Sequence, residues 1–245
     1  MTLSIAIAGA NGRMGKALLA AANEDPRFAV SGSTTRGGSV REAAASAEIW
    51  IDFTTPEATL AALDVLGQTK VRAAVIGTTG MSADQTTRIA ETAKRIAVVY
   101  SGNFSLGVNL LAALVQEAAD KLGPDWDIEI IETHHRRKID APSGTALMLG
   151  EAAARGRHTK LADVRIAPRE GVTGPRPAGG IAIASLRGGG VIGEHDVTFA
   201  SERETITLSH KALDRALFAD GALAAAFWAA NKPPGLYSMQ DVLEL

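Results

Sequence analysis

Short apolar runs alternate with segments rich in helix-forming residues over the first hundred positions of the chain. Runs of this length suit buried strands, and their alternation with helices predicts a parallel sheet covered on both faces. The predicted strands are residues 3–8, 28–33, 48–53, 71–77 and 95–100. Predicted helices begin near Arg13, Pro56 and Ser82. The pattern therefore indicates a Rossmann-type α/β domain.

Small and hydroxyl-bearing residues follow each predicted strand, at the edge where an open parallel sheet binds its ligand. These strand ends are residues 9–15, 33–36, 52–56, 77–80 and 101–104. The first has the spacing G-x-x-G-x-x-G between a strand and a helix, which lets a diphosphate approach the helix N-terminus. Such a turn can also arise for steric reasons alone. Five ligand-suited strand ends together favour a dinucleotide site.

The end of the second strand indicates which dinucleotide is preferred. An acidic residue there commonly holds the ribose 2′-hydroxyl of NAD, whereas an arginine accommodates the 2′-phosphate of NADP. This chain has Ser-Thr-Thr-Arg at residues 33–36 and no acid. We therefore predict that Arg36 binds the 2′-phosphate and that NADPH is preferred, with NADH possible. The alternative is that Arg36 is a solvated loop charge.

The pattern changes after residue 104. An amphipathic helix is predicted over residues 105–122, ending at Gly123-Pro124, and an alternating strand over residues 126–133. Three later segments are rich in β-forming residues and predict an antiparallel sheet with one exposed face that could pair with other subunits: residues 181–190, 191–201 and 204–212. Residues 168–180 are too rich in Gly and Pro for regular structure and suggest a mobile flap.

The stretch ETHHRRKIDAPSGTAL, residues 132–147, places five basic side chains ahead of a helix start. Ser143 suits the N-cap position, and a helix N-terminus close to Lys138 would bind a carboxylate between two positive groups. His134 or His135 could exchange a proton near neutral pH. If the strand continues, adjacent histidines point to opposite faces, which argues against a metal site. The alternative is a solvated basic turn.

Composition limits the possible partners. Lys and Arg total 25 against 27 Asp and Glu, so the overall charge favours neither nucleic acid nor an anionic membrane. The chain has no cysteine, and its N-terminal apolar run is too short for a signal peptide or a membrane span. We therefore expect a cytoplasmic protein that binds a small molecule.

Seven motifs together resemble the dihydrodipicolinate reductase family: GANGRMG, IDFTTPE, VIGTTG, NFSLGVN, EIIETHHRRKIDAPSGTA, VIGEH and HKALDRALFADGA. The resemblance covers nearly the whole chain. It implies a dinucleotide-binding domain from residues 1–105 and 215–245, and an α+β substrate-binding and tetramerisation domain from residues 106–214 with a mixed or antiparallel sheet. It also implies NAD(P)H-dependent reduction of the cyclic dicarboxylate 4-hydroxy-tetrahydrodipicolinate, in lysine and diaminopimelate biosynthesis, by a homotetramer.

The same resemblance implies roles for individual residues. His134 and Lys138 would be catalytic, and His135, Gly144 and Thr145 would bind the substrate. The cofactor would be bound by four groups of residues: Gly9, Ala10, Asn11, Gly12, Arg13 and Met14; Phe53 and Thr54; Gly77, Thr78 and Thr79; Ser101, Gly102, Asn103 and Phe104. His195 is expected to be a satisfied sheet histidine. The chain departs from the family in lacking the acid after the second strand. Another dehydrogenase of small acids and a nucleotide-sensing module without turnover are the alternatives.

Overall fold

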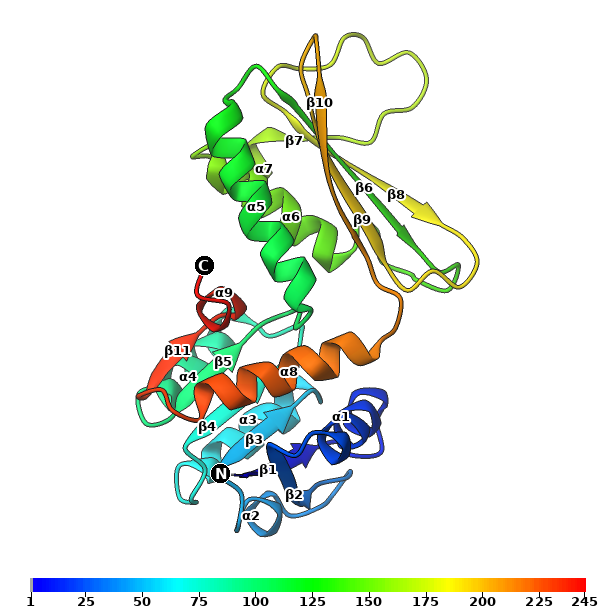
Figure 1. Ribbon diagram of the computed structural model, residues 1–245. Coiled ribbons are helices and arrows are strands. Elements are labelled where there is room, and N and C mark those ends of the chain that lie inside the picture. Colours follow the sequence, from blue (N-terminus) through cyan, green and yellow to red (C-terminus); the bar gives the residue numbers. More distant parts are fainter. Residues whose placement is uncertain (1) are drawn as a thin grey trace. The chain divides into compact units, whose positions relative to one another are not determined.

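The computed structural model describes residues 2–245, and their contacts divide the chain into two compact units. Unit 1 contains the residues up to Leu106 together with Arg215–Leu245, and unit 2 contains Gly107–Asp214. The C-terminal segment thus returns to the unit in which the chain began, as the colours of Figure 1 show.

Unit 1 is built on a six-stranded sheet in the order β11-β5-β4-β3-β1-β2, in which every paired strand runs parallel to its neighbour. Its central strands are buried along their whole length because helices cover both faces. The strands are β1 (Leu3–Ala8), β2 (Phe28–Ser33), β3 (Ile49–Asp52), β4 (Ala73–Ile76), β5 (Ala97–Tyr100) and β11 (Gly235–Tyr237).

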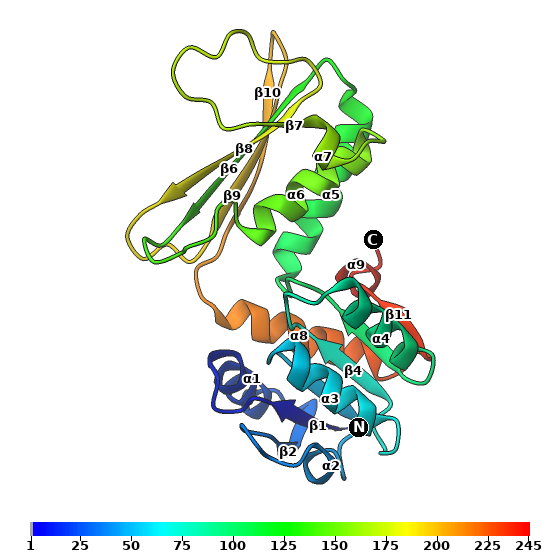
Figure 2. The ribbon, with the colours of Figure 1, turned by 180° about the vertical axis from the view of Figure 1, so that it is seen from behind.

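The helices of unit 1 form two layers, one on each face of the sheet. One layer shares a core with Ile5, Ile7 and Val99 and consists of α1 (Arg13–Glu24), α8 (Ala216–Ala229) and α9 (Met239–Val242). The other packs around Trp50 and Ile76 and consists of α2 (Val40–Ala43), α3 (Pro56–Leu66) and α4 (Ala83–Ala93). Figure 1 shows α8 in front of the sheet, and Figure 2, from behind, shows α3 and α4 in front.

Unit 2 has a five-stranded sheet in the order β10-β9-β6-β8-β7. Its elements are α5 (Leu106–Leu122), β6 (Asp127–His134), α6 (Gly144–Gly156), α7 (Leu161–Val164), β7 (Arg165–Ile166), β8 (Ile181–Arg187), β9 (Glu194–Ala200) and β10 (Thr205–Lys211). The antiparallel pairing expected of the later segments holds for β9 and β10, whereas β8 runs parallel to both β6 and β7, so the sheet is mixed, one of the two arrangements predicted. The reason is the crossover through α6 and α7, which lets the chain re-enter the sheet in the same direction.

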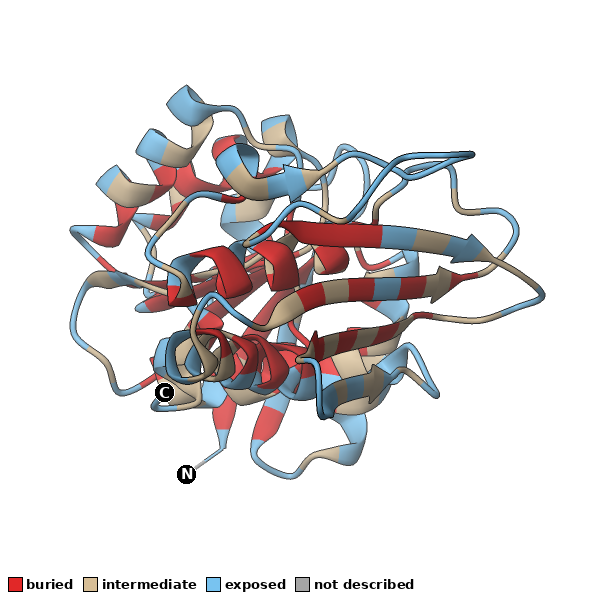
Figure 3. Cartoon of the chain, turned by 90° about the horizontal axis from the view of Figure 1, so that it is seen from above, coloured by how far each residue is buried: buried red, intermediate tan, exposed pale blue. Residues whose placement is uncertain are grey.

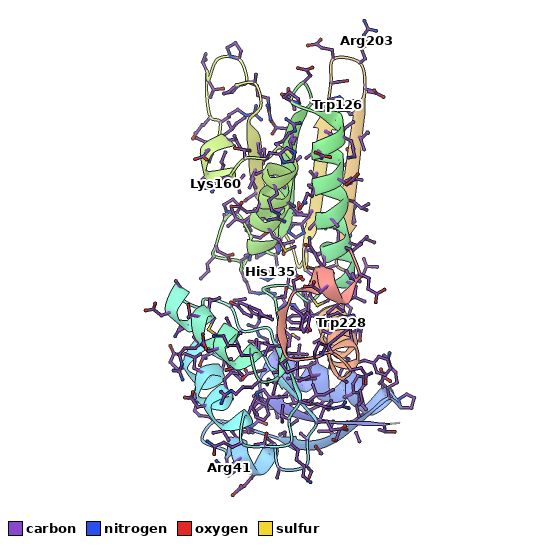
Figure 4. All side chains as sticks on the ribbon, turned by 90° about the vertical axis from the view of Figure 1, so that its left-hand side faces the viewer. Arg41, Trp126, His135, Lys160, Arg203 and Trp228 are labelled. Atoms are coloured by element: carbon purple, nitrogen blue, oxygen red, sulfur yellow. The ribbon has the colours of Figure 1, made fainter. Side chains whose placement is uncertain are left out.

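Helices α5 and α6 lie side by side on one face of this sheet (Figures 1 and 2). Residues of β6 and β9 alternate between buried and more exposed positions, a banding visible in Figure 3. Trp126 and His135, which flank β6, mark its two ends in Figure 4. The parallel six-stranded sheet with a second mixed sheet confirms the predicted fold class.

Residues 168–180 contain no helix or strand, which confirms their predicted irregularity. Arg176 ties this segment to the sheet, because its guanidinium contacts the carboxylates of Asp127 and Glu129 at 2.7 and 2.9 Å. Mobility of the segment stays a prediction. No helix within residues 2–245 is long and apolar enough to cross a membrane.

Candidate active site

A cavity of about 890 Å³ opens at the carboxyl ends of β1, β2 and β3 in unit 1. It brings together most of the residues predicted for the first three strand ends. Those that line it are Gly9, Asn11, Gly12, Arg13, Met14, Arg36, Phe53 and Thr54. Ala10 is buried behind the turn, while residues 77–79 and 101–104 follow the neighbouring strands β4 and β5 and do not line this cavity.

The glycine turn between β1 and α1 is shaped by close backbone approach. Gly9 has φ of +69°, a left-handed conformation that favours glycine, and its carbonyl accepts a 2.8 Å hydrogen bond from the Gly12 N–H. A Cβ on Gly15 would lie 2.2 Å from the Gly9 oxygen. Helix α1 begins at Arg13 with Gly12 as N-cap and no side-chain cap. The turn therefore leaves a helix N-terminus suited to an anion.

A buried carboxylate stabilises the next turn. Asp52, at the end of β3, is 1% exposed, and its Oδ1 accepts from the Thr54 backbone N–H at 2.9 Å and the Thr54 hydroxyl at 2.6 Å. The Trp50 indole N–H lies 3.4 Å from Oδ2. Thr78, from the end of β4, contacts the Thr54 N–H at 3.1 Å. Asp52 thus connects two strand ends of the predicted cofactor edge.

Two aromatic rings and a glycine pack together beside this turn. Phe53 meets Phe104 edge to face, with ring centroids 5.1 Å apart. A Cβ on Gly77 would lie 2.0 Å from the Phe53 ring, so only glycine leaves room for the ring. Arg36, in the segment after β2, is exposed and lines the cavity.

A second polar cluster lies in unit 2, at the carboxyl end of β6. Ile128 and Ile130 fill the core on the helix-covered face, and Glu132 and His134 occupy the next two positions on that face. The Nδ1 of His134 lies 2.5 Å from Oε2 of Glu132. Glu132 is 0% exposed, so this strand end buries an ionisable pair.

Arg187, the last residue of β8, compensates the buried carboxylate. Its two terminal nitrogens contact the two oxygens of Glu132 at 2.8 and 2.7 Å, a bidentate pair. Burial acts to raise the pKa of Glu132, but hydrogen bonds from Arg187, Ser185 and His134 outweigh it and lower the pKa to about 2. Glu132 is therefore ionised at neutral pH. Burial lowers the pKa of His134, against the opposing effect of Glu132.

Ser143 joins this cluster to the start of α6. Its hydroxyl accepts a 3.1 Å hydrogen bond from the Ala146 N–H, which confirms the predicted N-cap. The Ser143 backbone N–H donates to Glu132 at 3.1 Å, and its Oγ lies 3.1 Å from Nε2 of His195. His195 is buried in β9, as expected of a sheet histidine, but it is not fully satisfied, because its Nδ1 is buried without a hydrogen-bond partner among the described residues. Its ring also packs against that of His134, with centroids 5.2 Å apart.

The strand does not continue past His134. β6 ends at His134, and a turn follows in which the Lys138 N–H donates to the His135 carbonyl at 3.0 Å. Gly188, in the turn after β8, donates to the His134 carbonyl at 2.9 Å, so the neighbouring loop ends the strand pairing. The basic side chains of residues 134–138 therefore do not alternate across a strand.

Lys138 is not an isolated cation. Its Nζ lies 2.9 Å from Oδ2 of Asp140, and its side chain is 19% exposed. The Arg187 guanidinium also donates to the Asp140 carbonyl at 2.8 Å, which fixes the loop between β6 and α6. Helix α6 begins at Gly144, which is exposed, and Thr145 is partly buried beside it. His135 is also partly buried and follows the strand end.

The sequence pattern did not indicate a role for Glu132, Arg187 or Asp52. Glu132 had a detectable signal, because a residue two positions before His134 on a strand shares its face. Asp52 was placed at a strand end but not recognised as a buried hydrogen-bond acceptor. Arg187 lies 55 positions from Glu132, and local pattern alone does not reveal that pairing.

Comparison with known proteins gives consistent matches over both units. Residues 3–104 match the family model described as dihydrodipicolinate reductase, N-terminus, and residues 107–243 match the model of its C-terminus. A protein of Caulobacter vibrioides named 4-hydroxy-tetrahydrodipicolinate reductase is 56% identical, covering 98% of this chain and 97% of its own. A protein of the same name from Rhizobium rhizogenes is 47% identical, covering 99% and 97%.

A solved structure is also similar. The dipicolinate-bound dihydrodipicolinate reductase of Paenisporosarcina sp. TG-14 has a TM-score of 0.78 and 25% sequence identity, and the match covers 98% of this chain and 99% of that one.

Proposed function

The chain belongs to the dihydrodipicolinate reductase family, and from this premise we propose that it reduces 4-hydroxy-tetrahydrodipicolinate to tetrahydrodipicolinate with a pyridine nucleotide. This reaction is a step of lysine and diaminopimelate biosynthesis. The observation that carries the proposal is the buried Glu132–His134 pair beside the Lys138 loop and the N-terminus of α6. That cluster offers a proton carrier and positive groups for a carboxylate.

Unit 1 has the features that a dinucleotide requires. The left-handed Gly9, the uncapped start of α1 and the 890 Å³ cavity fit a diphosphate and its nucleosides. In the proposal, residues 9–14, Phe53, Thr54, 77–79 and 101–104 hold the cofactor, which supplies the hydride. Arg36 binds the 2′-phosphate, so NADPH is preferred over NADH.

Unit 2 supplies the acid–base and carboxylate-binding groups. His134 exchanges a proton with the substrate, and Lys138 provides an ammonium beside the developing charge. His135, Gly144 and Thr145 bind the substrate, with the start of α6 facing one of its carboxylates. Binding of that carboxylate must compete with Asp140, which holds the Lys138 ammonium in this structure.

A homotetramer in the cytoplasm completes the proposal. The face of the unit 2 sheet opposite to α5 and α6 exposes Ile131 on β6 and Leu186 on β8, at 41% and 54%. An open apolar sheet face favours association with another copy. Light scattering of the purified protein would measure the subunit number, and a monomer would remove this part of the proposal.

The activity is tested by following NADPH oxidation at 340 nm. The unstable substrate is generated in the cuvette from aspartate semialdehyde and pyruvate by the synthase that condenses them. We expect oxidation that requires all of these components, whereas omission of the synthase should abolish it. NADPH binding without oxidation in the complete mixture would instead indicate a nucleotide-sensing module and would overturn the proposal.

A further inference from the structure

We propose that Glu132, clamped by Arg187, is the positioning residue of the reaction: it fixes the His134 ring so that Nε2 is the atom that exchanges the proton. This inference rests on the proposed function, because His134 is the proton carrier there. Glu132 acts through His134 and does not itself meet the substrate. Four observations from unit 2 support the assignment.

The first observation is the short contact between carboxylate and ring. Oε2 of Glu132 lies 2.5 Å from Nδ1 of His134. Because Glu132 is ionised and only accepts, Nδ1 must be the nitrogen that carries a hydrogen. The neutral imidazole is then left with Nε2 as its proton acceptor. A carboxylate that selects the tautomer of an imidazole in this way is a recurring feature of acid–base sites.

The second observation is that the sheet register builds the clamp. β6 lies between β8 and β9, and Glu132 is opposite Ser185 on one side and His195 on the other. His134 is opposite Arg187, so the guanidinium reaches back to both oxygens of Glu132. The carboxylate is therefore held at both oxygens and has little freedom to rotate.

The third observation is the space at the other ring nitrogen. A Cβ on Gly193 would lie 3.0 Å from Nε2 of His134, so any larger side chain at that position would press against the nitrogen. Glycine leaves Nε2 uncovered on that side. Gly193 immediately precedes β9, and its N-terminal neighbours form the connection after β8.

The fourth observation concerns the charges that face His134. These are Glu132 on its own strand, Arg187 on β8, Lys138 in the following loop and His195 on β9. Burial lowers the pKa of His195 to about 4, so that ring is neutral at pH 7. Glu132 is then the group that favours the imidazolium, against burial and two cations. Without it, the pKa of His134 must fall.

The test compares Glu132→Gln with Glu129→Gln. Glu129 lies on the same strand and also pairs with arginines, Arg169 and Arg176, but its side chain points to the opposite face from His134. We expect Glu132→Gln to lower kcat about 100-fold with a smaller change in KM, and to move the His134-dependent limb of the pH profile of kcat/KM about one unit or more toward acid. Glu129→Gln should change neither kcat nor the pH profile of kcat/KM.

A second readout does not depend on turnover. In ¹⁵N spectra of histidine-labelled protein, His134 should be the Nδ1–H tautomer when neutral, and its titration should move toward acid in Glu132→Gln. If Glu132→Gln does not fold, Glu132→Asp carries the same test, because it keeps the charge but withdraws it from Nδ1. Glu132→Asp should lower kcat and should shift the pH profile less than Glu132→Gln does.

Three results have distinct meanings. A wild-type pH profile in both Glu132 variants would overturn the inference. A neutral His134 that carries its hydrogen on Nε2 would also overturn it. If the wild-type protein shows no NADPH oxidation, the proposed function fails, and the ¹⁵N titration still decides whether Glu132 sets the tautomer.

Discussion

Replacing Gly15 with alanine should destabilise the protein even though alanine is the stronger helix former. Gly15 lies in the first turn of α1, as the third glycine of the turn after β1. A Cβ there would lie 2.2 Å from the Gly9 oxygen, 2.7 Å from the Ala10 Cα and 2.8 Å from the Gly9 carbonyl carbon. All three are backbone atoms, so no side-chain rotation relieves the overlap.

Two effects of opposite sign determine how much Gly15→Ala changes the free energy of unfolding. Alanine in place of glycine favours a helix by about 1 kcal/mol. Overpacking against fixed atoms costs about 1–3 kcal/mol, and the short distances at Gly15 favour the upper end. The net loss is then about 2 kcal/mol, which corresponds to a fall in Tm of roughly 4–8 °C for a chain of this size. The displaced start of α1 should also weaken NADPH binding, because the diphosphate would lie against it.

Thermal unfolding followed by circular dichroism, with NADPH titration by fluorescence, checks both expectations. Gly144→Ala is the matched control, since Gly144 also lies in a first helical turn but a Cβ there would meet nothing within 4 Å. The Tm of the Gly144→Ala variant should stay the same as in the wild type or rise. An unchanged or higher Tm in Gly15→Ala would refute the packing argument and leave helix propensity as the dominant effect.

Three further substitutions test separate residues. Lys138→Ala should lower kcat about 100-fold in the coupled assay, because one preorganised donor stabilises a transition state by about 3 kcal/mol. NADPH affinity should stay unchanged, and equal losses in kcat and NADPH affinity would indicate misfolding. Arg36→Ala should lower the NADPH/NADH ratio of kcat/KM at least about tenfold, because it removes a charge-assisted hydrogen bond to the 2′-phosphate. The control Arg41→Ala, at an exposed position on α2, should leave the ratio unchanged. An unaltered ratio in Arg36→Ala would show that Arg36 does not bind the 2′-phosphate. Asp52→Asn should reduce the free energy of unfolding by about 1–3 kcal/mol in urea titrations. The neutral amide oxygen is a weaker acceptor for the two Thr54 donors than the carboxylate, and the amide nitrogen cannot accept from the Trp50 indole N–H. Asp64→Asn on the surface should stay within about 0.5 kcal/mol, and similar values for the two variants would contradict this.

Local pattern predicted the features that depend on neighbours in sequence. Strands β1 to β5, helices α1, α3 and α4, the glycine turn after β1 and the Ser143 cap of α6 were predicted, because each follows from a few consecutive residues. The same holds for the position of His134 at a strand end. These features are local because hydrogen bonds within a helix or turn join residues only a few positions apart.

Features that depend on strand register were missed. The parallel pairing of β8 with β6 follows from the crossover through α6 and α7, which the β-rich pattern of residues 181–190 does not indicate. The Glu132–Arg187 pair requires β8 to lie beside β6 in one particular register. A shift of one residue would turn the Arg187 side chain to the other face, and the pair would not form.

The buried Glu132–Arg187 pair is poorly explained by stability alone. Removing a carboxylate from water costs several kcal/mol, and a well-packed apolar pair in its place commonly leaves a protein as stable or more so. An apolar pair could not replace either polar contact. The Glu132 carboxylate accepts a hydrogen bond from Nδ1 of His134, and the Arg187 guanidinium donates one to the Asp140 carbonyl. One guanidinium here fixes both the carboxylate behind His134 and the loop that carries Lys138. The buried charges are therefore better explained by the fixed His134 geometry that the proposed reaction requires than by a contribution to folding.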